Sequence, residues 1–134
     1  MDDWEDRYVG RWFDGNGTEI EIVKVCRHRF VVSYWRDGRA ILRPWMKNQP
    51  SIEMPARYID DPLSGGDFVV DLTESQGDCS LHLYYEECDY LSPEKGEIIS
   101  TTVSVPERYD KALLDQCCSL FLCQDHLHRL TKES

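Results

Sequence analysis

The sequence predicts a mainly β protein, a single antiparallel barrel of about seven to nine strands with a short helix near the C-terminus. From Tyr8 to about Val105, short runs of alternating or β-branched residues are separated at regular intervals by Gly, Asp, Asn and Pro. Serial short strands of this kind are typical of antiparallel barrels and sandwiches. We expect one domain, residues 1–134, because two halves would each be too small to bury a good core.

The first part of the chain predicts four strands joined by tight turns. Ile20 and Ile22 alternate with acidic residues, as expected of a strand with one buried face. Asp37-Gly38 is a strong signal for a two-residue hairpin, because both residues tolerate positive φ. The four expected strands are Tyr8–Phe13, Thr18–Val25, Phe30–Arg36 and Arg39–Arg43.

The segment from Pro44 to Pro62 predicts a long irregular connection with at most a short strand near Ile52–Met54. Several prolines and mixed polar residues interrupt any regular pattern there. Beyond it, alternate apolar residues again share one face in three stretches. The expected strands are Phe68–Leu72, Cys79–Glu87 and Glu97–Val105.

The C-terminal part changes to helical spacing. Apolar residues between Tyr109 and Cys117 recur at intervals of three and four, and Pro106 fits the first turn of a helix. We therefore expect a helix over Glu107–Cys117. The remainder allows two interpretations: Ser119–Cys123 and His126–Leu130 form a closing hairpin, or the chain continues as helix.

The charge and composition of the chain indicate which classes of partner and which cellular location to expect. The net charge is −10, and such a surface repels phosphate backbones and anionic lipid, so we expect no nucleic-acid and no membrane partner. The acidic first residues lack the basic and apolar regions of a secretory signal, which predicts a cytoplasmic protein. In a reducing compartment the six cysteines are expected to be free thiols.

Gly10-Arg11-Trp12, set before the Asp14–Gly17 turn and followed by repeated hairpins, resembles the calycins: the lipocalins, fatty-acid-binding proteins and avidins. In lipocalins this Trp packs across the base of the barrel, and an Arg late in the chain often packs over it. The resemblance implies that Arg129 takes that part. It also implies an interior cavity for a small, mostly apolar ligand, as barrels of about eight strands can hold.

The leading hypothesis is therefore non-enzymatic binding of a small, mostly apolar ligand in this cavity. Aromatic residues with polar tips often line ligand cavities, and an Arg suits capture of an anionic group. The expected ligand-binding residues are Trp12, Tyr34, Trp35, Arg36 and Tyr85. Neighbouring residues on a strand point to opposite faces, so only one residue of each pair Tyr34/Trp35 and Tyr84/Tyr85 can face inward.

Other function classes have weaker signals. No catalytic motif is recognisable, and Cys79 and His82 would face opposite sides of a strand. Soft ligands gather at Cys117, Cys118, Cys123, His126 and His128, but the spacing lacks a paired C-x-x-C, so we expect no metal and no cofactor. The alternative hypothesis is a protein-interaction module, homodimeric or with another protein partner, with a filled core and no small-molecule ligand.

Overall fold

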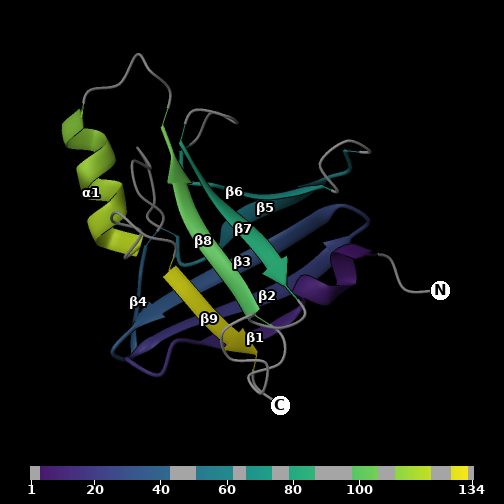
Figure 1. Ribbon diagram of the computed structural model, residues 1–134, viewed down its shortest axis with the longest axis horizontal. Coiled ribbons are helices and arrows are strands. Elements are labelled where there is room, and N and C mark those ends of the chain that lie inside the picture. The colour runs from purple at the N-terminus through teal and green to yellow at the C-terminus, as the bar shows by residue number, and fades with distance from the viewer. Residues whose placement is uncertain are drawn as a thin grey trace.

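The computed structural model describes residues 4–42, 51–61, 66–73, 79–86, 98–105, 111–121 and 128–132. These segments form a mainly β structure with one 3₁₀ helix and one α-helix (Figure 1). In chain order the elements are η1 (Trp4–Tyr8), β1 (Gly10–Phe13), β2 (Thr18–Cys26), β3 (Arg29–Arg36), β4 (Arg39–Ala40), β5 (Met54–Ile59), β6 (Asp67–Asp71), β7 (Ser80–Glu86), β8 (Ile98–Ser104), α1 (Lys111–Phe121) and β9 (His128–Lys132).

Eight of these strands close into an antiparallel barrel. The neighbours around the ring are β1, β2, β3, β5, β6, β7, β8 and β9, and β9 returns to pair with β1. Each barrel strand therefore lies beside the next barrel strand along the chain, as in up-and-down barrels. The short strand β4 pairs only with β3 among the described strands and lies outside the ring. The predicted antiparallel barrel with a C-terminal helix is confirmed.

The strand β5 corrects the expectation of an irregular connection after Pro44. It spans Met54–Ile59, pairs with both β3 and β6, and buries Met54, Ala56 and Tyr58 on its inner side. Pro55 is the second residue of the strand and pairs with β3 alone, because the pairing of β5 with β6 begins at Ala56; on the β6 side it therefore has the place of an edge residue. The connecting residues 43–50 and 62–65 lie outside the described segments.

The C-terminal part combines the two interpretations left open by its sequence. The helix α1 extends to Phe121, four residues beyond the predicted end at Cys117, and a strand then follows, β9 at His128–Lys132. The predicted first helical residues, 107–110, lie outside the described segments. Cys117 and Phe121 are both fully buried, and their spacing of four residues places them on one face of the helix.

The Gly-x-Trp motif on β1 packs against the last strand. Trp12 is fully buried, and its indole N–H donates to the carbonyl oxygen of Tyr8 at 3.0 Å. The Lys132 Nζ atom lies 5.5 Å from the centroid of the Trp12 ring, a cation–π geometry. Gly10 has φ of +139°, and a Cβ atom there would lie 2.8 Å from Cε of Lys132. Lys132 thus packs over Trp12; the side chain of Arg129, expected in this role, is not among those described.

Replacing Trp12 tests its place in this packing. We expect Trp12→Ala to lower the free energy of unfolding by about 3–5 kcal/mol, because a large buried ring is removed and a cavity remains. Trp35→Ala is the matched control, since Trp35 is only partly buried and faces away from the interior, and it should cost less than half as much. Urea unfolding followed by circular dichroism measures both. Equal losses would contradict a core role for Trp12.

Candidate functional site

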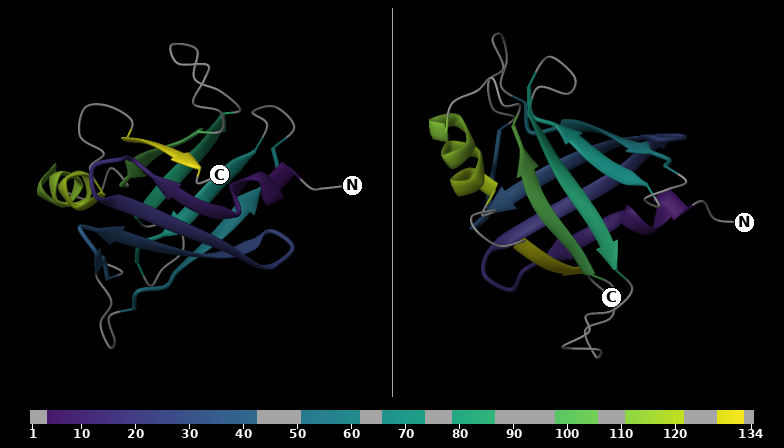
Figure 2. Two further views of the ribbon diagram at one scale, coloured as in Figure 1. Left: turned by 90° about the horizontal axis from the view of Figure 1, so that it is seen from below. Right: turned by 45° about the horizontal axis from the view of Figure 1, so that its top comes forward.

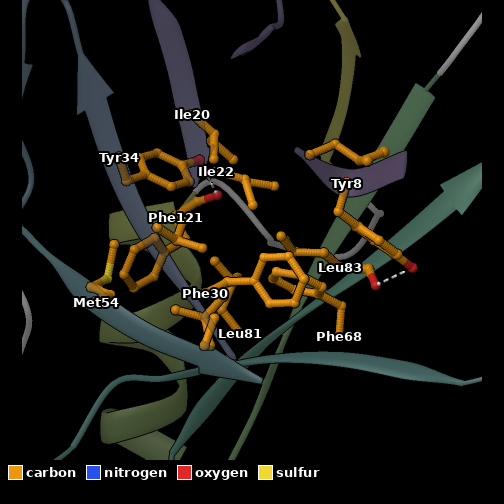
Figure 3. Packing of buried hydrophobic residues seen from close by; sticks show 14 of the residues in the cluster. Tyr8, Ile20, Ile22, Phe30, Tyr34, Met54, Phe68, Leu81, Leu83 and Phe121 are labelled. Carbon is orange, nitrogen blue, oxygen red and sulfur yellow. Dashed lines mark hydrogen bonds between the residues drawn. The ribbon is translucent and has the colours of Figure 1, made fainter. Parts of the chain in front are cut away.

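Aromatic side chains pack across the interior of the barrel (Figure 3). The Tyr8 ring stacks on Phe68 with centroids 4.5 Å apart, and Phe68 in turn contacts Phe30 at 4.9 Å. Tyr34 meets Phe121 of α1 edge-on at 5.1 Å. All five rings are at most 4% exposed. The inward-facing side chains therefore contact one another along the barrel, from the end near η1 to the end near α1.

The helix η1 closes one end of the barrel, opposite the end where α1 lies (Figures 1 and 2). The carboxylate of Glu5 is 1% exposed and accepts the backbone N–H of His28 at 2.8 Å. The same carboxylate lies 3.0 Å from Nδ1 of His28 and 3.8 Å from Nζ of Lys24. Tyr8 donates its hydroxyl to the carbonyl oxygen of Leu83 at 3.3 Å. These contacts join η1 to the β2–β3 hairpin and to β7.

At the other end, side chains of β3 hold the C-terminus of α1. The hydroxyl of Tyr34 donates to the carbonyl oxygen of Phe121 at 3.0 Å. The Nη1 atom of Arg36 donates to the carbonyl oxygens of Ser119 and Leu120, at 3.1 and 3.0 Å. Carbonyls in the last turn of a helix lack intrahelical partners, and a cation there also interacts favourably with the helix dipole. These bonds explain why the helix continues past Cys117 to Phe121.

A shallow pocket of about 440 Å³, largely open to solvent, lies where Arg36 meets α1. This volume falls within the range of small-molecule sites in proteins. Besides Arg36, its lining comes from two turns of the helix: Asp115, Gln116, Ser119 and Leu120. Within the described part of the chain, the hydrogen bonds of the Arg36 guanidinium all come from Nη1. Among the described residues, no hydrogen-bond partner is found for its Nε and Nη2 atoms.

The sequence-predicted ligand residues lie in three different environments. Trp12 and Tyr34 are fully buried in the interior, and Tyr85 is partly buried with its ring 6.3 Å from that of Trp12. Trp35 follows the inward-facing Tyr34 and therefore lies on the outer face, opposite Glu19 of β2. Arg36 lies at the α1 end. The structure thus brings Trp12 and Tyr85 together and separates Trp35 and Arg36 from them.

The helical residues of the pocket were not predicted. Ser119 and Leu120 lie beyond the helix expected from the sequence, and Asp115 and Gln116 carry no motif of their own. Cys117 and Phe121 are both apolar and lie four residues apart. This spacing is the sequence signal that could have predicted a helix as far as Phe121, and with it the helical residues of the pocket.

Comparisons with protein-family models, with curated proteins and with solved structures find no significant match for this chain. Among the described residues, no group of three or more His, Cys, Asp or Glu could hold a metal ion; Cys123 and His126 of the sequence cluster lie outside them. No described helix is long and apolar enough to cross a membrane.

Two buried acidic groups, the phenol of Tyr8 and the thiol of Cys117, are expected to make the protein less stable at alkaline pH. Burial raises the pKa of Tyr8 from 10.0 to about 12 and the pKa of the Cys117 thiol from 9.0 to about 12. The folded state keeps these protons where the unfolded chain loses them. The free energy of unfolding should therefore be fully retained below pH 9 and fall as the pH rises from 9 towards 12. Urea unfolding at several pH values in this range measures the fall.

Tyr8→Phe is the control for the phenol contribution. The variant keeps the ring but has no hydroxyl proton to titrate, so its free energy of unfolding should fall less steeply than that of the wild type above pH 10. The lost bond to Leu83 lowers stability at every pH and does not change this slope. Parallel curves for the two proteins would contradict the prediction.

Proposed function

We propose that this chain is a calycin-like barrel that binds a small carboxylate ligand at its α1 end, in the pocket lined by Arg36. The single observation that carries the proposal is this pocket of about 440 Å³, in which a cationic side chain faces a helix surface. The proposal moves the ligand from the interior, where the sequence resemblance implied it, to the end of the barrel. The packing of Tyr8, Phe30 and Phe68 across the interior supports that change.

Arg36 is suited to bind a carboxylate. A guanidinium has five N–H donors in a planar fork, and Nη1 is already fixed by two carbonyls of α1. The remaining edge, Nε with Nη2, matches the two oxygens of a carboxylate. Because the helix holds the guanidinium in place, less conformational freedom is lost when a ligand binds.

The other pocket residues define the rest of the ligand. Asp115 is an acceptor that favours an ammonium or hydroxyl group beside the ligand carboxylate, and Leu120 offers an apolar contact. The net charge of −10 disfavours ligands with several negative charges. These features fit a small amino acid or hydroxy acid better than a fatty acid or a nucleotide.

Native mass spectrometry with a panel of amino acids, hydroxy acids and plain carboxylic acids tests the proposal. We expect a stoichiometric adduct with a member of the panel, weakened at least about tenfold in Arg36→Gln, which corresponds to ~1.4 kcal/mol. Arg39→Gln is the matched control, because Arg39 is exposed on β4 and does not line the pocket. Equal binding by the wild type and Arg36→Gln would contradict the proposal.

Because Arg36 also holds α1, a second variant separates binding from folding. Asp115→Asn leaves the bonds between Arg36 and the helix carbonyls in place. The variant should bind amino acids more weakly relative to plain carboxylic acids, because only amino acids have an ammonium group that gains from the negative charge of Asp115. Unchanged selectivity would remove Asp115 from the site.

A second candidate function, association with a second copy of this chain, is supported by an apolar row on the outer face. Val23, Val31 and Pro55 lie in register on β2, β3 and β5. Val25 lies two residues beyond Val23 and is 64% exposed. Exposed apolar side chains in adjacent positions release water when two surfaces meet. The packed interior agrees with a function carried by the surface.

Sedimentation velocity tests this association. We expect a dimer that strengthens with added salt, because salt screens the repulsion between two acidic copies. Val25→Lys should shift the protein towards the monomer. Leu42→Lys is the control, since Leu42 is 48% exposed but lies outside the row. A monomer at every salt concentration would rule out the second copy as partner.

A further inference from the structure

A serine, a histidine and an aspartate form a hydrogen-bonded chain on the outer face of the barrel. Oγ of Ser80 lies 3.0 Å from Nε2 of His82. On the other side of the ring, Nδ1 of His82 lies 3.1 and 3.2 Å from the two carboxylate oxygens of Asp67. These residues belong to β6 and β7 and share no side chain with the Arg36 pocket.

Strand geometry explains how the three side chains meet. Ser80 and His82 are two residues apart on β7 and therefore point to the same face. The pairing of Phe68 with Leu83 sets Asp67 of β6 diagonally across from His82, within reach of a long side chain. In the sequence, the nucleophile considered beside His82 is Cys79, which the structure places in the core. The residue on the same face as His82 is Ser80, and the sequence predicts this pair only if the two-residue period of the strand is applied from His82.

The carboxylate determines which nitrogen of His82 carries the proton. An ionised Asp67 can only accept hydrogen bonds, so the proton of the neutral imidazole lies on Nδ1. Nε2 is then left as the acceptor for the hydroxyl of Ser80. A nucleophilic hydroxyl, a base within hydrogen-bond reach and a third group that orients the base are the parts of an activated serine.

We propose that Ser80 is a nucleophile for small esters, with His82 as the general base and Asp67 as the residue that positions it. Oγ attacks the ester carbonyl carbon while the hydroxyl proton passes to Nε2 of His82. The bond to the alcohol oxygen then breaks, and His82 returns the proton to the departing alcohol. Water, deprotonated by His82, attacks the acyl group on Ser80, which releases the carboxylic acid and restores the hydroxyl.

The surroundings of Ser80 limit the substrate and the rate. Ser80 is 7% exposed and the side chain of His82 is 19% exposed, so only a small acyl group such as acetyl fits the inference. Asp71 lies opposite Ser80 on β6, and Nε of Arg57 lies 3.5 Å from its carboxylate, which offsets that charge. No donor for the developing oxyanion is identified among the described residues, so we expect slow turnover.

A covalent probe is therefore the sharpest test. The protein is treated with a small alkyl fluorophosphonate, which loses fluoride when a serine oxygen attacks phosphorus. The modified residue is then mapped by peptide mass spectrometry. We expect a single adduct on Ser80, absent in Ser80→Ala and at least tenfold slower to form in His82→Gln. Asp67→Asn should also slow labelling, because the orienting carboxylate is lost.

A second buried serine provides the matched control. Ser100 of β8 is 2% exposed on the same outer face, and within the described part of the chain its Oγ has no hydrogen-bond partner. It should remain unlabelled, and Ser100→Ala should label like the wild type. No adduct on the wild type, an adduct on another serine, or equal rates in His82→Gln and the wild type would overturn the inference. Mapping on the wild type decides the question even if Ser80→Ala fails to fold.

Hydrolysis of a small aryl acetate provides an independent readout, with the same order of variants expected. Arg39→Gln, at an exposed position of β4 that belongs to neither site, should label at Ser80 and hydrolyse the ester as the wild type does. The adduct on Ser80 and the carboxylate adduct at the Arg36 pocket are measured separately, so failure of one site is distinguishable from failure of the other.

Discussion

The pairing of β9 with β1 is the contact on which the rest of the structure depends. It joins Trp12 to Lys132 and Phe13 to Thr131 in register, and it closes the ring, so that neither strand is left with an open edge at this seam. The closure also brings Lys132 over the Trp12 ring and requires a residue without a Cβ at Gly10. The motif that makes β1 recognisable in the sequence is thus explained by packing across the seam.

Closure of the ring leaves two ends, and the protein covers both with polar contacts. At one end the buried carboxylate of Glu5 ties η1 to the β2–β3 hairpin. At the other, Tyr34 and Arg36 bind carbonyls of the last turn of α1. A buried carboxylate or a helix carbonyl without a hydrogen-bond partner destabilises the fold. These contacts therefore supply the missing partners and also hold η1 and α1 in place. A polar side chain at the end of the barrel, such as Arg36, therefore stabilises the fold through some of its hydrogen-bond donors. Only the donors that are not used in this way can bind a ligand.

Local patterns were sufficient to predict most of the strands but not the sites. The alternation at Ile20 and the Asp37–Gly38 turn, both of whose residues adopt positive φ, are properties of a few consecutive residues. For β5 the sequence predicted at most a short strand near Ile52–Met54, whereas the strand spans Met54–Ile59, because a proline indicates a break unless its position near the start of a strand is known. The end of α1 depends on Arg36, eighty-three residues from Ser119, and no local pattern contains such a contact.

The same alternation that fills the interior also separates the two proposed sites. Leu81 and Leu83, which face inward on β7, are fully buried in the core, while Ser80 and His82 beside them face outward. The Ser80–His82 pair therefore adds no polar group to the packed interior. Its geometry depends on the register of β6 with β7, whereas the Arg36 pocket depends on the position of α1 against β3. Because residues that share no contact or hydrogen-bond network respond nearly independently to substitution, and the two sites have no side chain in common, we expect each site to change without the other.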